Sequence, residues 1–182
     1  VGGAPGKQWA GPHPDALKDV TFNRIVAYVR EIIDEVKPKR SFYTLETMPW
    51  MLPDSADNYV RLLKAIDRKQ FAVHFDAVNL IYSPQRYFDT AGVIREFVAK
   101  LGPHIRSCHA KDVLLDSKAT THLDEVRPGL GGLDYGVLLT ELNKLDPDTP
   151  LMLEHLSKAE QYAEAAQYVR SVAEKAGVKF KM

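Results

Sequence analysis

The sequence predicts an α/β fold built around a parallel β-sheet, and three features of the chain support this prediction. Stretches of strand length alternate with longer stretches of helical periodicity. The strand-length stretches are rich in apolar, aromatic and β-branched residues, as in strands that are buried on both faces. Each of them ends in a polar residue. This alternation is typical of βαβ units that share one parallel sheet.

The individual elements follow from the spacing of apolar residues and from the residues that interrupt it. Helical spacing predicts helices over residues 19–36, 56–67, 90–101 and 157–176, and one more that carries Val137, Leu138, Leu142 and Leu145. Strands are predicted over residues 41–46, 71–76, 105–112 and 150–154. Residues 116–134 have no clear period and are predicted to be a loop. Ser157 and Glu160 have capping-box spacing, and Gly177 is expected to end the last helix.

The length of the chain limits the architecture. A complete (β/α)₈ barrel takes about 250 residues, whereas this chain has 182 residues and four predicted strands. The pattern therefore fits either an open α/β sheet or the later half of a barrel. Residues 1–6 are rich in Gly and Pro, like a loop that follows a strand. We expect residues 1–182 to form a single domain.

Composition and charge narrow the classes of partner. Lys and Arg total 24, as do Asp and Glu, so the net charge is zero and no nucleic acid is expected as a partner. No apolar stretch reaches the length of about 18 to 20 residues that spans a membrane, so no membrane partner is expected. Cys108, the single cysteine, cannot form an internal disulfide, which favours a cytoplasmic location. We expect its side chain to be buried as a small apolar group.

The polar residues at the strand ends predict a metal centre. They are Glu46, Asp76, His109 and Glu154. In parallel α/β folds the ligand site lies at the carboxyl ends of the strands, so these four side chains should converge. Three carboxylates can share one site only if a cation offsets their repulsion. Oxygen-rich ligation with one imidazole favours Mn²⁺ first, with Mg²⁺, Co²⁺ and Zn²⁺ as alternatives.

Further polar residues share the same face of the sheet. Because side chains alternate along a strand, His74 should point the same way as Asp76, and Lys111 the same way as His109. His74 either contacts a metal ligand or the substrate, or is a core histidine bonded to the backbone. The glycine-rich stretch 128–132 lacks the Lys-Ser/Thr of a phosphate-binding loop and is interpreted as a turn near the site.

These motifs resemble a known superfamily. Leu45-Glu46, His74-Phe75-Asp76, His109-Ala110-Lys111-Asp112, the glycine-rich stretch and Leu153-Glu154 are similar to motifs of the xylose isomerase-like TIM-barrel superfamily. The resemblance implies that the chain supplies roughly the last four strands of a (β/α)₈ barrel. It also implies that Glu46, Asp76, His109 and Glu154 bind the metal.

The same resemblance implies a function. Ketose 3-epimerases of this superfamily use the two glutamates as an acid/base pair, which assigns that catalytic role to Glu46 and Glu154. The expected enzyme is a divalent-metal-dependent sugar or polyol isomerase or epimerase that abstracts a proton next to a carbonyl bound to the metal. His74, Asn79 and Lys111 are the candidate substrate contacts.

The chain departs from these epimerases in three ways. No substrate-binding arginine is evident shortly after His109, although Lys111 could supply a positive charge. Asn79 stands where they carry a substrate-contacting histidine, and Leu52 where they carry a glutamate. The His109-x-Lys111-Asp112 segment resembles inosose dehydratases, in which a lysine beside the metal would assist loss of water. Dehydration of a polyol ketone is therefore an alternative function.

Two other classes are further alternatives. An apurinic-site endonuclease would need three zinc ions and an Asp-x-His motif, but Leu123 and Glu125 stand at those positions. A non-catalytic binding module would fail to hold metal. The partner expected for the enzyme is a small sugar or polyol, and a homo-oligomer is left open.

Overall fold

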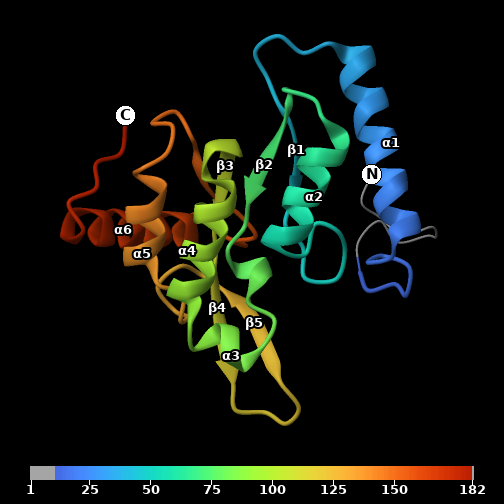
Figure 1. Cartoon of the computed structure of the whole chain (residues 1–182). Helices are drawn as coiled ribbons and strands as arrows, with labels where there is room; N and C mark the ends of the chain where they lie inside the picture. Colours follow the sequence, from blue (N-terminus) through green and yellow to red (C-terminus); the bar gives the residue numbers. More distant parts are fainter. Residues whose placement is uncertain (1–10, 182) are drawn as a thin grey trace.

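Four parallel strands form the sheet that the sequence predicts. The computed structural model describes residues 11–181, so the expected loop over residues 1–6 lies outside the described part. The strands lie side by side in the order β1 (Tyr43–Glu46), β2 (Phe71–Phe75), β3 (Ile105–Ala110) and β6 (Leu151–Leu153). Figure 1 shows β1 and β2 next to each other. All three neighbouring pairs are parallel. Their carboxyl ends therefore lie at one end of the sheet.

The helices pack against one another and cover the sheet. They are α1 (Asp19–Val36), α2 (Ala56–Ile66), α3 (Pro84–Tyr87), α4 (Thr90–Leu101), α5 (Tyr135–Leu142) and α6 (Ala159–Lys175), with 3₁₀ turns over Val78–Leu80 and Gly102–His104. Helix α1 packs on α2, α2 on α4, α4 on α5 and α5 on α6. Over residues 11–181, none of the helices combines the length and the apolar character that crossing a membrane requires.

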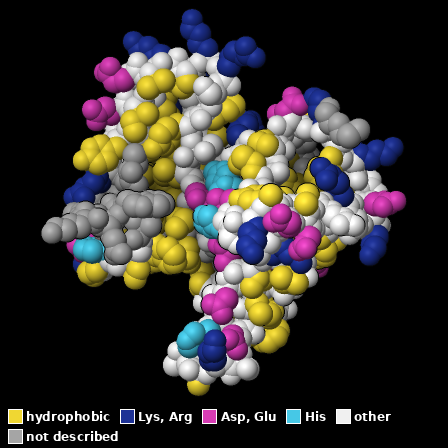
Figure 2. Space-filling model, turned by 180° about the vertical axis from the view of Figure 1, so that it is seen from behind, with side chains coloured by type: hydrophobic (Ala, Val, Ile, Leu, Met, Phe, Trp, Pro, Cys, Tyr) yellow, Lys and Arg dark blue, Asp and Glu magenta, His cyan; other side chains and the backbone are white. Residues whose placement is uncertain are grey.

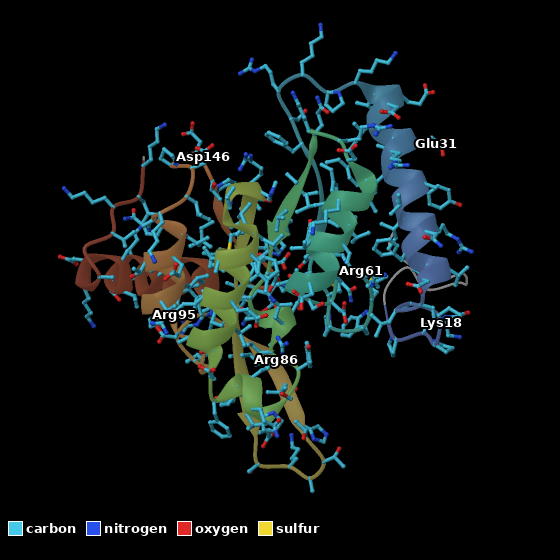
Figure 3. The ribbon with its side chains drawn as sticks, in the orientation of Figure 1. Lys18, Glu31, Arg61, Arg86, Arg95 and Asp146 are labelled. Atoms are coloured by element: carbon cyan, nitrogen blue, oxygen red, sulfur yellow. The ribbon has the colours of Figure 1, made fainter. Side chains whose placement is uncertain are left out.

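Aromatic residues of the helices pack against the sheet or form hydrogen bonds with it. The Tyr59 hydroxyl of α2 lies 2.6 Å from the carbonyl of Leu45 on β1 and 2.9 Å from that of Ala72 on β2. Phe97 of α4 stacks on Phe75 of β2 with ring centroids 4.3 Å apart. On the outer side, Arg61 extends from α2 towards α1, where its guanidinium lies 4.5 Å from the centre of the Phe22 ring (Figure 3). The buried core thus lies between the helices and one face of the sheet.

Two predictions around the third strand were wrong. The strand predicted over residues 105–112 ends earlier, and the loop predicted over residues 116–134 contains a strand. Strand β3 stops at Ala110, and a separate strand β4 (Asp112–Asp116) begins two residues later. It pairs antiparallel with β5 (His122–Val126), which lies within the expected loop. This hairpin extends beyond the parallel sheet (Figure 1). Its second strand is mostly exposed, so it carries little of the apolar signal that reveals a buried strand.

Two helix ends also differ from the prediction. Helix α5 ends at Leu142, so Leu145 lies beyond it, although Leu145 still packs against the core. No capping box opens α6, because Ser157 donates from its backbone N–H and its hydroxyl to Gln161 Oε1 at 3.1 and 3.0 Å. The predicted stop at the other end of α6 is confirmed. Gly177 has φ +69°, and the next amide, that of Val178, donates to the carbonyl of Ala173 at 2.9 Å.

The glycine-rich stretch is a turn that wraps the buried carboxylate of Asp112. Asp112 Oδ2 accepts from the amides of Gly129 and Gly131 at 2.9 and 3.1 Å, and Oδ1 accepts from Leu133 at 2.9 Å. A Cβ at Gly131 would lie 2.3 Å from the carbonyl oxygen of Val113, so no larger residue fits there. The carboxylate thus ties the hairpin and the turn to the end of the sheet.

We expect Asp112→Asn to lower the free energy of unfolding by about 3 kcal/mol, because an amide group cannot accept all of these N–H bonds. Urea denaturation followed by circular dichroism measures the change. Asp124→Asn is the matched control, since Asp124 is exposed on the same hairpin. A loss no larger than that of the control would show that the turn does not depend on this carboxylate.

Candidate metal centre

The strand ends bring four potential ligands to one place. Glu46 is the last residue of β1, Asp76 directly follows β2, His109 lies near the end of β3, and Glu154 directly follows β6. One donor atom from each of the four lies within 4.8 Å of the others. Seen from behind, histidine and acidic side chains gather near the middle of the molecule (Figure 2). The convergence that the strand pattern predicts is therefore present.

The donor atoms have the spacing of a metal coordination shell. His109 Nδ1 lies 3.2 Å from Glu46 Oε1, 3.2 Å from Asp76 Oδ2 and 2.8 Å from Glu154 Oε1. Ligands about 2.1 Å from an octahedral cation lie about 3.0 Å apart along each edge. One ring nitrogen can donate at most one hydrogen bond, so it cannot satisfy three carboxylates by itself. The donor set therefore fits a divalent cation.

Backbone and side-chain hydrogen bonds orient the carboxylates. Asp76 Oδ1 accepts from the amides of Val78 and Asn79 at 3.0 and 3.2 Å, which leaves Oδ2 facing His109. The Thr47 hydroxyl lies 2.8 Å from the carbonyl oxygen and 3.1 Å from the amide nitrogen of Asp76, and so joins β1 to β2. The side-chain amide of Asn79 donates to Glu46 Oε1 at 3.1 Å. Asn79 thus contacts a candidate ligand directly.

Lys111 places a buried ammonium group among the carboxylates. Its side chain is 2% exposed, and Nζ lies 2.9 Å from Asp76 Oδ2 and 3.5 Å from Glu46 Oε1. It also forms an ion pair with Glu154. Burial lowers the pKa of Lys111, but the charges of Asp76 and Glu154 outweigh that effect and raise it. Lys111 therefore remains charged and offsets part of the negative charge.

The pKa values of two candidate ligands are shifted in opposite directions. Burial raises the pKa of Asp76, but hydrogen bonds and charge from His109 and Lys111 outweigh it and bring the pKa down to about 2. Burial lowers the pKa of His109, but hydrogen bonds with Asp76 and Glu46 outweigh it and raise the pKa to about 9. At neutral pH the histidine therefore carries a proton that a metal ion must displace.

We expect the affinity for a divalent cation to rise about tenfold per pH unit between pH 7 and 8, because binding releases the His109 proton. The stability of the metal-free protein should change in the opposite direction. Because the pKa of His109 is higher in the folded state, its stabilising contribution is complete below the ordinary histidine pKa of 6.5 and is lost as the pH rises through about 9. Titration calorimetry in two buffers of different ionisation enthalpy counts the released protons. An affinity that is the same at pH 7 and pH 8 would contradict this expectation.

The remaining predicted residues also lie at the centre or beside it. His74 is buried, and its ring packs edge-on against that of His109 with centroids 4.0 Å apart. Burial and the charge of His109 lower the pKa of His74. Cys108 is fully buried, and burial raises the pKa of its thiol, which agrees with a packing role.

Two residues near the centre were missed. Glu125 of β5 lies 3.6 Å from Lys111 Nζ, and its carboxylate is 2.9 Å from His155 Nδ1. His155 has a positive φ of 58°, and its Nε2 lies 3.7 Å from Glu154 Oε2. The sequence did not signal Glu125, because β5 lies in a polar stretch and reaches the site only through the hairpin. His155 directly follows Glu154, and strand alternation predicts that it points away from the site.

Comparisons with known proteins agree with this architecture. A family model described as xylose isomerase-like TIM barrel matches residues 3–172. The chain is similar to a xylose isomerase domain protein from Planctomyces limnophilus, at 20% identity and a TM-score of 0.68, covering 93% of this chain and 58% of that one. A xylose isomerase-like TIM barrel protein from Mycobacterium smegmatis, solved in complex with magnesium, has 22% identity and a TM-score of 0.64, with 93% and 54% covered.

A third similar structure is that of an enzyme whose activity is named. It is a D-psicose 3-epimerase from Clostridium cellulolyticum H10, with 14% identity, a TM-score of 0.61 and coverage of 96% of this chain and 61% of that one. A comparison with curated proteins gave no match. At these identities the structural likenesses show the fold alone. This chain spans between 54% and 61% of the length of the three structures.

Proposed function

We propose, from the premise that this chain belongs to the xylose isomerase-like TIM-barrel family, that it is part of a divalent-metal-dependent sugar or polyol isomerase or epimerase. The observation that carries the proposal is the convergence of Glu46, Asp76, His109 and Glu154 at the spacing of a coordination shell. Residues 1–182 would form one domain with four of the barrel strands. Such an enzyme would act in carbohydrate metabolism in the cytoplasm.

The four residues would hold one cation. Three carboxylates and one imidazole favour Mn²⁺, with Mg²⁺, Co²⁺ and Zn²⁺ as alternatives. When bound next to a substrate carbonyl, such an ion would acidify the adjacent C–H bond. The proton itself would be moved by residues of the chain.

Glu46 and Glu154 would move that proton. They come from β1 and β6, the two outer strands of the parallel sheet, and so approach the centre from opposite sides. One carboxylate would remove the proton and the other would return one. Return to the opposite face of the same carbon gives epimerisation, and return to the neighbouring carbon exchanges an aldose and a ketose. His74, Asn79 and Lys111 would contact the substrate.

Lys111 favours dehydration as a second candidate function. Its ammonium is buried and paired with Glu154, so it could give a proton to a departing hydroxyl group once Glu154 has taken a proton from the adjacent carbon. A polyol ketone of the inosose type would then lose water. The two functions need the same four ligands. They differ in the second step: epimerisation returns a proton to carbon, whereas dehydration breaks a C–O bond with a proton from Lys111 and releases water.

Metal analysis followed by isotope exchange tests the proposal. The purified protein is dialysed, its metal content is measured, and ketoses and inososes are incubated with it in D₂O. We expect about one Mn, Mg or Co per chain, and deuterium at the carbon next to the carbonyl of one substrate. Three zinc ions would instead favour the endonuclease class. Absence of specific metal would refute the proposal and favour a binding module.

A further inference from the structure

We infer that His74 gives the centre a second, nitrogen-rich metal position, formed by Glu46, His74 and His109. The inference rests on the proposed metal centre and adds a second donor set to it. One donor atom from each of these three residues lies within 4.8 Å of the others, as in the four-residue set. The two sets share Glu46 and His109, so a cation has two overlapping places to bind.

The sheet holds His74 firmly beside the shared ligands. His74 lies on β2 in register with Glu46 on β1 and with Ser107 on β3. Its Nδ1 is 2.5 Å from the Ser107 hydroxyl oxygen. A hydrogen bond on one ring nitrogen orients a histidine and leaves the other nitrogen to act as a ligand.

The other ring nitrogen of His74, Nε2, has no hydrogen-bond partner in the described part of the chain. Only 8% of the residue is exposed, and Nε2 is buried without a hydrogen bond to any residue that the structure describes. A buried nitrogen left unpaired is costly, and such groups are uncommon in folded proteins. When Nδ1–H donates to Ser107, the lone pair of Nε2 is free to bind a cation.

The two donor sets suit different metals. Imidazole nitrogens favour Zn²⁺, Ni²⁺ and Cu²⁺, whereas carboxylates favour Mg²⁺ and Mn²⁺. The set with two imidazoles and Glu46 should therefore take Zn²⁺ or Cu²⁺, and the set with three carboxylates should take Mn²⁺. The identity of the metal would then decide which position is filled, and whether Asp76 and Glu154 are bound to it.

Metal titrations of three proteins test this inference. Zn²⁺ and Mn²⁺ are titrated into wild type, His74→Gln and His104→Gln, the last being a control because His104 is exposed at the opposite end of β3. We expect His74→Gln to weaken Zn²⁺ binding at least about tenfold and to leave Mn²⁺ binding within about twofold. His104→Gln should change neither. Retained Mn²⁺ binding also shows that the variant is folded.

A spectroscopic count gives an independent result. Pulsed electron paramagnetic resonance of the Cu²⁺-loaded protein should detect two coordinated imidazoles in wild type and one in His74→Gln. If the variant does not fold, the wild-type count decides, and a single imidazole would overturn the inference. Equal loss of Zn²⁺ and Mn²⁺ binding in a folded variant, or unchanged Zn²⁺ binding, would overturn it as well. Wild type that binds no metal at all would refute the proposed function too.

Discussion

Glu154→Gln is expected to lower kcat at least about 10³-fold, because an amide cannot accept a proton from the substrate carbon. The side chain keeps its shape, so the fold should persist. The measurement is the rate of deuterium incorporation from D₂O at the carbon next to the carbonyl. Glu174→Gln is the matched control, since Glu174 is exposed in the last turn of α6. Metal content is measured in parallel, because Glu154 is also a candidate ligand.

Metal content, kcat and KM together distinguish a loss of proton transfer from a loss of metal binding. A variant that retains its metal but loses kcat with little change in KM has lost an interaction made only in the transition state. Glu46→Gln should give a similar loss. A fully loaded Glu154→Gln protein with an unchanged rate would falsify the acid/base assignment.

The second large effect is expected for metal binding itself. His109→Ala and Asp76→Asn should each weaken Mn²⁺ binding at least about 100-fold, because each removes a charged or lone-pair donor from the centre. His109 Nδ1 contacts all three carboxylates. Asp76 is fully buried, and its Oδ2 faces His109. Competition with a chelator of known affinity measures the change.

Matched controls carry the same substitutions outside the centre. His104→Ala removes an exposed imidazole, and Asp148→Asn removes an exposed carboxylate that pairs with Lys181. Both should bind Mn²⁺ like wild type. If Asp76→Asn and His109→Ala also bind Mn²⁺ like wild type while remaining folded by circular dichroism, the metal lies elsewhere and these four residues are not its ligands.

Much of the fold could be predicted from local sequence patterns. Helix α1 begins and ends at the predicted residues, and α4 does so too, because amphipathic spacing and the residues that end it are local features. The β1 and β2 strands are short apolar runs whose last or next residue is acidic. Since parallel strands align their carboxyl ends, position along each strand also predicted which side chains would meet.

Other features depend on contacts between distant parts of the chain. The β4–β5 hairpin is held by backbone pairing and by the Asp112 carboxylate, and neither leaves an apolar period in the sequence. Its second strand, β5, was therefore predicted as part of a loop, and Glu125, which the hairpin brings towards Lys111, was missed.

The alternation of strands and helices and the four polar residues at the strand ends could be predicted from the sequence alone, because periodicity and alternation act within a few residues. The three-dimensional arrangement was needed to place the Lys111 ammonium among the carboxylates, and to show that the buried Nε2 of His74, beside His109, has no hydrogen-bond partner within residues 11–181. Charge pairing and desolvation depend on distances between residues far apart in the chain. Local sequence patterns therefore cannot predict charge pairing or desolvation.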